Sequence, residues 1–600
     1  MRTAVTWNTI STKCLETGKP RRQNFGFPKK LNKMDEDDLD LLLFDQLVLE
    51  PQQAVTIEAE PLVLNSEGDI RVKLVATATS QLLRFLTVGC EEGNVKVYNI
   101  SPSLTTPDNV NTTAVYKLNE NGKGLSVLST LVKFAKKGNA YVEGAIPYVL
   151  AVCACSKDAK VKQDALNHVG VICNRPRMIL EFVAYCEEIS KNISRTSGWG
   201  RGRKRAVQKW YSNKRSYEVA FAVTSCSTVN HWSHKDVLRL CHLNPANSLC
   251  LKILCMYIAR GYQATENAFR DEIAKSDEAD AIKLMELLGV IRKLKNSTVA
   301  ADSCALIEKH NLTWGHIPCK LRNNAEVWKC LIPKLGMAAL IRNLPRFHHI
   351  GVLVNGNIWT KQILQRLFND DSIEQSELHP YSFLLHHYIY AKGESARKEM
   401  KWIPDPLISQ ALDAAFYTAI PNVKATNKRI CITLDASKSM KAHIVNSHCL
   451  ECRVVAAAMC LVFSKVEKDV TVQGFSSQLT DIDIGDKDTV KSTVEKIDQI
   501  PLGGTDCSRP MIKAKKEKKP FDVFIVITDK ETWKGKTSPH IALKQYREEM
   551  QIPAKFILIS LAVRKMEKDV DGASDRGMLS ICGFNESVPD IIHDFICDEF

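Results

Sequence analysis

A carboxylate and two hydroxyls stand at alternate positions directly after an apolar run in the C-terminal third of the chain. The run covers residues 430–434, and Asp435, Ser437 and Ser439 follow it. Apart from Thr433 the run is apolar on both faces, which is typical of a buried parallel strand, so the polar residues are expected in the loop after it. Open α/β sheets place their ligands at the carboxyl ends of such strands. This feature therefore predicts a ligand site at the edge of a parallel sheet.

Two later motifs add the same kind of ligand. Thr505 follows a glycine pair, and Asp529 follows the largely apolar run 521–528. Three hydroxyls and two carboxylates suit a hard divalent cation, Mg²⁺ first, which prefers oxygen ligands and keeps some of its waters. The alternative is a serine-rich helix cap, which would explain Ser439 but not the two distant partners. Lys438 stands inside the first motif, where its ammonium would either lower metal affinity or contact an acidic partner.

Two patterns of periodicity divide the chain. Between about 120 and 420 apolar residues recur at three and four positions without a strict repeat length, which predicts an irregular α-solenoid of serial helix pairs. Helical examples are 161–173, 178–189, 236–243, 279–294, 325–332 and 362–367. After Pro421 we expect strands at 430–434, 470–475, 521–527 and 555–561, and helices at 452–466, 488–497 and 541–550. That alternation predicts a doubly wound parallel sheet. Earlier in the chain, the alternating residues that begin at Arg84 predict a β-hairpin.

Composition excludes few classes of protein. The chain has 600 residues, of which 45% are hydrophobic and 25% charged, and its net charge is +13. No stretch approaches 18 uncharged apolar residues, so no membrane span is expected. The first 50 residues read as a charged tail without the apolar core of a secretory signal, although their basic, nearly acid-free start leaves a mitochondrial presequence as an alternative.

Cysteine usage indicates a reducing compartment. Several of the 20 cysteines lie in apolar helix-like segments, as Cys250, Cys255 and Cys460 do, which is typical of reduced cysteines in a cytosolic or nuclear protein. Cys449 and Cys452 form a lone CxxC pair without a second matched pair, so we favour a plain helix start there over a zinc site.

A basic segment between residues 191 and 215 contains nine Lys or Arg residues and no acid. At helical spacing its apolar positions share one face and are expected to dock inward: Ala206, Val207, Trp210 and Tyr211. Arg205, Gln208 and Lys209 would then point away, with Lys204 at the edge. The sequence predicts a rigid cationic ridge here, and the alternative is an ordinary solvated helix face.

A second basic helix is expected just downstream. Ser233 and Asp236 resemble a capping box that starts it, and its free N–H groups favour an anion. One stripe follows at helical spacing: Lys235, Arg239 and His242. His234 lies in the first turn, where the dipole disfavours its protonated form, so we expect a hydrogen-bonding or stacking group. A histidine here can also be purely structural, but two neighbouring basic helices interleaved with Trp and Tyr favour RNA, which is held by phosphate contacts and stacking.

Strings along most of the chain resemble known families. Asp435, Ser437, Ser439, Thr505 and Asp529 resemble the metal-ion-dependent adhesion site of von Willebrand factor A domains. From about residue 80 to 600 the chain resembles the TROVE-domain family of SS-A/Ro ribonucleoproteins. The matching strings are RFLTVGCEEG from Arg84, GWGRGRKRAVQKWY from Gly198, WSHKDVLRL from Trp232, EVWKCLIP from Glu326, LDAAFY from Leu412, LDASKSM, IPLGGTDCS, DVFIVITDKET and DRGMLSICGF.

This resemblance implies a ring of HEAT-like helical repeats closed by a Rossmann-like von Willebrand A domain. It implies binding of small noncoding Y RNAs on the ring surface and of the single-stranded ends of misfolded structured RNAs, in RNA quality control. The RNA-binding residues of the family fall in the strings that hold Lys204, Arg205 and His234, with a slip of one residue open for the first two, because this chain is more basic there.

We therefore predict a charged tail at 1–50, a TROVE RNA-binding domain at 51–422 and a von Willebrand A domain at 423–600. The predicted function is non-catalytic RNA binding in the cytoplasm, with the nucleus left open, and the alternative is a metal-dependent scaffold that binds an acidic protein ligand. An enzyme is disfavoured, because the chain has neither a nucleophile elbow nor a phosphate-cradling loop. The predicted RNA-binding residues are Arg201, Lys204, Arg205, His234, Lys235, Arg239 and His242.

Overall fold

The structure of the chain, a computed structural model, describes residues 77–600 with gaps at 92–93, 97–111, 138–140, 143, 193–197, 230, 246–247, 276–277, 446, 476–477, 502–503, 531–536 and 564–574. All described residues belong to one unit, Val48–Phe600. The tail predicted at 1–50 and its alternative as a presequence lie outside the described residues. Within the described ranges, every helix is too short or too polar to cross a lipid bilayer.

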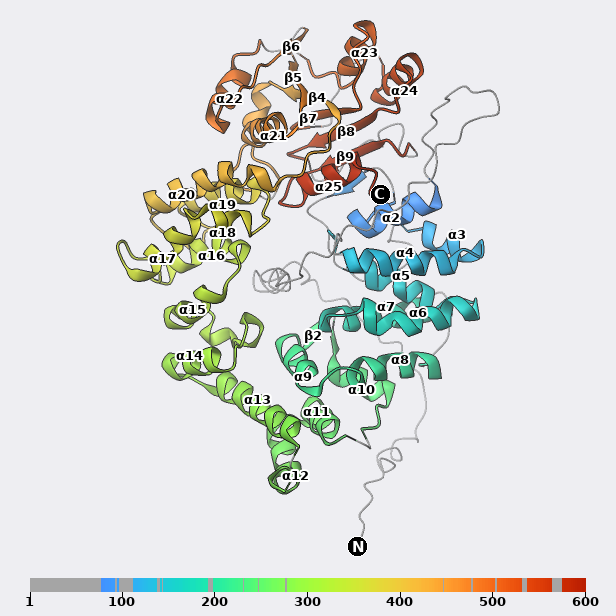
Figure 1. Ribbon diagram of the computed structural model, residues 1–600, viewed down its shortest axis with the longest axis vertical. Helices are drawn as coiled ribbons and strands as arrows, with labels where there is room; N and C mark the ends of the chain where they lie inside the picture. Colours follow the sequence, from blue (N-terminus) through green and yellow to red (C-terminus); the bar gives the residue numbers. More distant parts are fainter. Residues whose placement is uncertain are drawn as a thin grey trace, which may run out of the picture. The chain divides into compact units, whose positions relative to one another are not determined.

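Helices make up most of the described residues before 420 (Figure 1). Consecutive helices pack on one another, as α5 does on both α6 and α7, and this confirms the predicted α-solenoid. Every residue of α5 is buried, so this helix forms part of the core of the array. The helices are α2 (Ala78–Val88), α3 (Ala114–Glu120), α4 (Gly124–Lys137), α5 (Ala145–Ala154), α6 (Ala159–Ile172), α7 (Pro176–Asn192), α8 (Arg201–Ser212), α9 (Ser216–Ser225), α10 (His234–Cys241), α11 (Leu249–Arg260), α12 (Tyr262–Ala274), α13 (Ala279–Asn296), α14 (Ala300–Lys309), α15 (Ala325–Leu331), α16 (Met337–His349), α17 (Ile358–Leu367), α18 (Asp370–Glu374), α19 (Pro380–Lys392) and α20 (Pro406–Thr418).

The β-hairpin predicted from Arg84 is wrong. Arg84 lies in helix α2, which begins at a capping box between Thr77 and Ser80 and ends at Gly89 in the left-handed region, with φ 75°. The helix buries most of its residues. In a short apolar run the sequence pattern does not distinguish helix from strand, and here tertiary packing favours the helix. The strand that follows, β1 (Asn94–Lys96), pairs with the C-terminal sheet instead of a neighbouring strand.

The C-terminal region is a seven-stranded sheet in the order β1-β9-β8-β7-β4-β5-β6. All neighbouring strands are parallel except β5 and β6, which are antiparallel. The four predicted strands are confirmed as β4, β5, β7 and β8, whereas β1, β6 and β9 were not predicted. The strands beyond β1 are β4 (Arg429–Asp435), β5 (Asp469–Phe475), β6 (Leu479–Asp481), β7 (Val523–Thr528), β8 (Lys555–Ser560) and β9 (Met578–Cys582).

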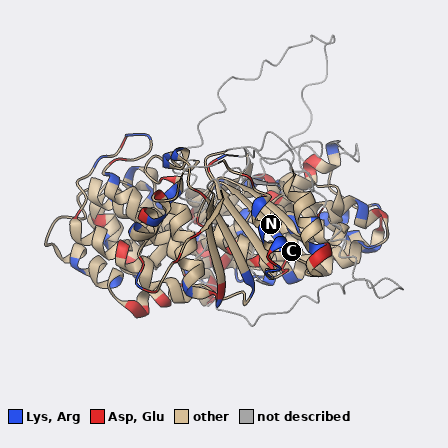
Figure 2. Ribbon diagram, turned by 90° about the horizontal axis from the view of Figure 1, so that it is seen from above, with Lys and Arg blue, Asp and Glu red and all other residues tan. Residues whose placement is uncertain are grey.

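Helices cover both faces of this sheet, as a doubly wound fold requires. On one face Met511 of α23 (Arg509–Lys516) and Tyr546 of α24 (Pro539–Met550) share a core with Phe524 and Phe556 of the central strands. On the other face the Lys555 ammonium donates to the carbonyls of Phe595 and Ile596 at the end of α25 (Val588–Ile596). Two further helices, α21 (Cys452–Val466) and α22 (Val490–Asp498), complete the domain. Figure 2 shows most of the sheet free of charged residues, which lie on the surrounding helices and loops.

Both ends of the helical array contact this sheet domain. At the N-terminal end, the Tyr141 hydroxyl donates to the Asp594 carboxylate at 2.9 Å. At the C-terminal end, Glu586 lies 2.9 Å from the His386 imidazole and 3.3 Å from the Arg342 guanidinium. Burial opposes ionisation of Glu586, but the hydrogen bond and charge of His386, together with Arg342, lower its pKa to about 2. The helical array is thus closed on itself through the sheet domain.

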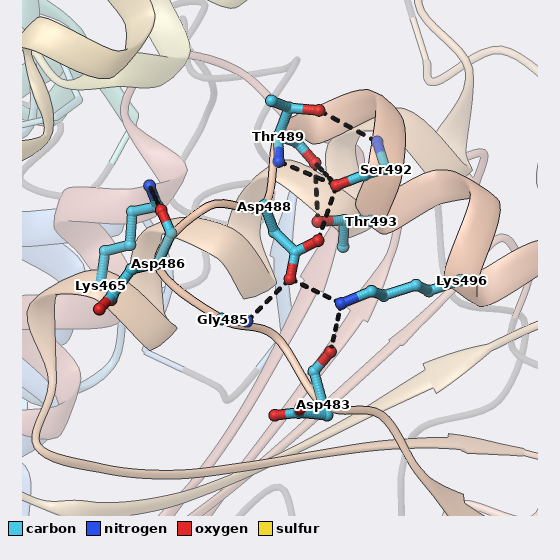
Figure 3. Close-up of polar contacts among 9 residues, drawn as sticks. All are labelled: Lys465, Asp483, Gly485, Asp486, Asp488, Thr489, Ser492, Thr493 and Lys496. Carbon is cyan, nitrogen blue, oxygen red and sulfur yellow. Dashed lines mark hydrogen bonds and ion pairs between the residues drawn. The ribbon is translucent and has the colours of Figure 1, made fainter.

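The connection between β6 and α22 is fixed by one carboxylate (Figure 3). Asp488 accepts hydrogen bonds from the Gly485 N–H, the Ser492 hydroxyl and the Lys496 ammonium, at 2.7, 2.8 and 2.6 Å. The hydrogen bond from Lys496 is the main reason that the pKa of Asp488 falls to about 2. The Asp488 carboxylate therefore has a structural role in holding the start of α22.

Candidate functional site

Helix α8 carries the first half of the predicted basic site. Its apolar residues Ala206, Val207, Trp210 and Tyr211 are all buried, as expected from their spacing. Of the five cations on the helix, three are exposed and two are half-buried: Arg201, Arg205 and Lys209, and then Arg203 and Lys204. Because a rigid buried face holds the helix, its cations are displayed in fixed positions rather than on a flexible segment.

Two residues of the basic segment turn inward instead. The Trp199 indole donates to the Glu187 carboxylate at 2.6 Å, and Arg203 approaches the same carboxylate at 3.5 Å. Arg203 also donates to the Ser190 hydroxyl at 3.0 Å. Glu187 and Ser190 lie on α7, so these contacts anchor the beginning of α8 to its neighbour. Arg203 is therefore a structural cation, although it lies in the densest basic stretch of the sequence.

Helix α10 carries the second half of the site. A two-stranded antiparallel ribbon, β2 (Thr228–Val229) with β3 (Trp232–Ser233), leads into it. The capping box predicted for Ser233 and Asp236 is present, with both the side-chain and the backbone hydrogen bonds. Lys235 and Arg239 are exposed, and Arg239 makes only a loose ion pair with Asp236, at 3.8 Å.

His242 departs from the predicted stripe. The helix ends at Cys241, and His242 adopts the left-handed conformation of the C-cap, with φ 53°. Its side chain is exposed, but it does not continue the helical spacing of Lys235 and Arg239. Many helices end at a residue in the left-handed conformation. The spacing of basic residues does not show where such an end falls.

His234 lies in the interior, with 2% of its surface exposed. Its Nδ1 lies 2.7 Å from the Tyr211 hydroxyl, and its ring stacks on Trp210 with an interplanar angle of 20°. Burial lowers the pKa of His234 to about 4, so the ring is neutral at pH 7. It stacks and hydrogen-bonds as expected, but its partners in the structure are protein side chains. Trp210 and Tyr211 are buried as well, so these three rings are not available to stack on bases.

The two basic helices are joined into one unit. Besides the Tyr211–His234 contact, the Gln208 amide donates to the carbonyls of Cys241 and His242, at 2.8 and 3.1 Å. Gln208 was expected to point into solvent, and nothing in its helical position indicates this bridge. We call the cations of α8 and α10 other than the inward-facing Arg203 the basic ridge: Arg201, Lys204, Arg205, Lys209, Lys235 and Arg239.

A second candidate site lies at the carboxyl ends of β4 and β7. Asp435 ends β4 and is buried, and its Oδ2 accepts hydrogen bonds from the Thr505 and Thr528 hydroxyls at 2.8 and 2.9 Å. Its Oδ1 accepts from the Ser437 backbone N–H at 2.8 Å. In the sheet, β4 lies between β7 and β5, where the strand order reverses, and open sheets bind ligands at such a point.

The remaining predicted ligands meet at the same place. The Ser437 and Ser439 hydroxyls lie 2.7 Å apart, and the Ser439 hydroxyl donates to the Asp529 Oδ1 at 3.0 Å. The structure therefore brings all five predicted residues together. We call them the oxygen cluster: Asp435, Ser437, Ser439, Thr505 and Asp529. Thr528 belongs to the same network and was not predicted, although its place directly before Asp529 could have indicated it.

The electrostatics of the oxygen cluster fit a cation. Asp529 is 2% exposed, and its Oδ2 has no hydrogen-bond partner among the described residues. Burial raises the pKa of Asp529, and the nearby charge of Asp435 raises it further. Two carboxylates and three hydroxyls, with a buried oxygen left without a donor, form a donor set that a hard divalent cation would complete.

Comparisons with known proteins show which family this chain resembles. A model of the TROVE domain matches residues 63–428, and a model of the Ro60 vWA domain matches residues 429–596. The first match alone spans more than half of the chain. The chain belongs to the TROVE-domain family. The basic ridge lies within the TROVE match, and the oxygen cluster lies within the vWA match.

Relatives of this TROVE-domain chain resemble it over nearly their whole length. RNA-binding protein RO60 of Caenorhabditis elegans is 28% identical over 622 residues, which cover 94% of each chain. RNA-binding protein RO60 of Deinococcus radiodurans is 26% identical over 518 residues, which cover 86% of this chain and 92% of the relative. The crystal structure of the Deinococcus radiodurans RO (RSR) protein aligns with a TM-score of 0.76 and covers 87% of this chain and 100% of that one. These matches confirm the predicted family and fold class.

Proposed function

We propose that this chain is a non-catalytic RNA-binding protein that holds structured RNA on the basic ridge. The observation that carries the proposal is the rigid pairing of α8 and α10, which displays six cations over a buried core of Trp210, Tyr211 and His234. Cations on rigid, packed helices are already in position when a phosphate backbone approaches. Phosphate contacts supply most of the affinity for nucleic acid. The names of two relatives, both RNA-binding proteins, support the same class of ligand.

Within that class we propose small noncoding Y-type RNAs and misfolded structured RNAs with single-stranded ends, in cytoplasmic RNA quality control. These finer assignments rest on the resemblance to the TROVE family. The exposed cations would contact phosphates directly. His234 would act by positioning α10 against α8, since its ring is neutral and enclosed by protein.

The test is a gel-shift titration of a bulged hairpin RNA over several salt concentrations. Wild type is compared with Lys204→Ala/Arg205→Ala and with a matched control, Lys361→Ala/Lys491→Ala, which removes two exposed charges from α17 and α22. The ridge variant should bind more weakly, and its log–log salt slope should be smaller by up to about two units. The control should keep the wild-type slope. Equal slopes for all three proteins would show that the ridge does not touch RNA.

We also propose that the oxygen cluster holds a divalent cation, with Mg²⁺ as the first candidate. Asp435 and Asp529 would supply the charge, and the Ser437, Ser439 and Thr505 hydroxyls would supply neutral ligands. A bound cation there would offer its open position to a carboxylate of an acidic protein partner. This second function is favoured by the buried Oδ2 of Asp529, which has no hydrogen-bond partner in the described part of the chain. Asp435→Ala should abolish metal-dependent partner binding while leaving hairpin-RNA affinity unchanged.

A further inference from the structure

A cysteine lies against the structural arginine of the basic segment. Cys155 directly follows α5 and is partly exposed. The Arg203 guanidinium donates to its Sγ at 3.3 Å, and the Ser190 hydroxyl lies 3.9 Å from the same sulfur. A cation and a hydroxyl thus converge on one thiol, and this is the environment that stabilises a thiolate.

A second thiol completes the arrangement. Cys186, on α7, is fully buried and lies beside Cys155. The backbone carbonyl of Cys186 also lies 3.9 Å from the Cys155 sulfur. The two sulfurs are therefore neighbours on packed helices, with one reachable from solvent and the other enclosed.

The groups around Cys155 favour its ionised form. The hydrogen bond from the Cys186 thiol lowers the pKa of Cys155 most, burial opposes this, and the charges of Arg203 and Lys162 lower the pKa further. Cys155 also stands at the C-terminal end of α5, where the helix dipole disfavours an anion. The cationic and hydrogen-bonding groups outweigh that effect.

The remaining neighbours do not reverse this balance. Glu187 also approaches Arg203, and this carboxylate accepts a hydrogen bond from the Trp199 indole. Burial raises the pKa of Tyr116 far above its usual value, and burial raises the pKa of Cys153 to about 12, so both stay neutral at pH 7. Arg203 therefore faces both the Glu187 carboxylate and the Cys155 sulfur.

We propose that Cys155 is a reactive thiolate and the site at which hydrogen peroxide and alkylating reagents modify this chain, with Cys186 as the resolving thiol. In the first step the Cys155 thiolate attacks one peroxide oxygen, the O–O bond breaks, and hydroxide leaves and takes up a proton. In the second step the Cys186 sulfur attacks the Cys155 sulfenic acid. The S–S bond forms, the S–OH bond breaks, and the Cys186 proton leaves with the hydroxyl as water.

Oxidation would reach the basic ridge through Arg203. Arg203 anchors the first turn of α8, and a disulfide removes its thiolate partner. The first residues of the basic ridge would then be held less firmly. The expected consequence is a several-fold weaker RNA affinity after oxidation, and this part rests on the proposed function. The thiol chemistry itself is measured without RNA.

The first experiment measures alkylation of the full chain by iodoacetamide, residue by residue, by mass spectrometry from pH 5.5 to 9. Cys319 is exposed and serves as the internal reference. The Cys155 rate should level off at least about one pH unit below the value of about 8.5 that is usual for a cysteine thiol. Arg203→Gln and, as a milder change, Ser190→Ala should move the Cys155 midpoint upward. A Cys155 profile that follows Cys319, or a midpoint that neither variant moves, would overturn the proposal.

The second experiment treats the folded chain with hydrogen peroxide. Wild type should form the 155–186 disulfide, and Cys186→Ser should stop at a sulfenic acid that dimedone traps on Cys155. Trapping on Cys155 without any disulfide in wild type would refute the resolving role of Cys186. Loss of RNA affinity on oxidation should be absent in Cys155→Ser. If wild type binds no RNA at all, the proposed function fails while the two thiol measurements still decide this proposal.

Discussion

The basic ridge and the oxygen cluster are both built from short polar motifs, but different forces position them. In the oxygen cluster, the register of two parallel strands aligns Leu434 with Ile527, so Asp435 and Asp529 emerge at the same edge of the sheet. In the ridge, each side chain takes its direction from the helices that pack against α8 and α10. In the sheet, the register of the strands that carry the motifs positions the site residues. On a helical surface, the positions of the side chains depend on contacts with helices elsewhere in the chain.

Trp210→Ala should have the largest effect and tests whether buried support makes the ridge. Removing a large side chain that is 2% exposed should lower the free energy of unfolding by about 3–5 kcal/mol. Denaturant unfolding followed by circular dichroism measures this, with Trp210→Phe as the milder comparison. A loss below about 1 kcal/mol would mean that α8 holds its place without this residue.

Asp435→Ala tests the oxygen cluster in the same way. At a Mg²⁺ concentration about one hundred times Kd, wild type should gain about 2.7 kcal/mol of stability, and the variant should gain none. Asp435→Asn, which keeps an acceptor for Thr505 and Thr528, separates lost charge from lost hydrogen bonds. Because burial raises the pKa of Asp529, protons compete with the cation, and in acid the gain should begin to shrink at a higher pH than for an ordinary aspartate. Equal stabilisation of wild type and both variants by Mg²⁺ would place the cation elsewhere.

Glu586→Gln tests the contact that joins the helical array to the sheet domain. Losing the charge-assisted hydrogen bonds to His386 and Arg342 should cost about 1–3 kcal/mol of stability at pH 7. The pKa of Glu586 is lowered by folding, so this contribution is complete above the unfolded value of about 4.3 and is lost as pH falls toward 2. Unfolding curves of both proteins at several pH values measure the difference. A difference that grows in acid would contradict the assigned ion pair.

Tyr211→Phe should have the smallest effect, about 1 kcal/mol, because it removes one hydrogen bond to His234 from an otherwise unchanged core.

The His234 pKa is lowered by folding, so its contribution to stability is complete above about pH 6.5 and declines as pH falls toward 4. His234→Gln, which cannot titrate, should make that decline smaller without abolishing it, because burial also lowers the pKa of His316 and of His379 to about 4. A decline as large in His234→Gln as in wild type would contradict a contribution from His234.

The sequence predicts the oxygen cluster of the sheet more completely than the basic ridge of the helices. All five residues of the oxygen cluster were predicted, four because a strand end places the residues that follow it at a known edge of the sheet and Thr505 because it follows a glycine pair. In the ridge the buried face of α8 was predicted from its period. The inward turn of Arg203, the bridge from Gln208 and the cap at His242 could not be, because each depends on contacts with other helices. The helix at Arg84 was missed for the same reason, since its burial against other elements decides its structure.

The central claim is that RNA is held by the basic ridge and not by the oxygen cluster. The most direct measurement is the dissociation constant of a bulged hairpin RNA for three proteins: wild type, Lys204→Ala/Arg205→Ala and Asp435→Ala, each with Mg²⁺ and with a chelator at constant ionic strength. We predict that only the ridge variant loses affinity, and that Asp435→Ala binds as wild type does in both conditions. Loss of RNA binding in a folded Asp435→Ala protein, with the ridge variant unaffected, would contradict the account.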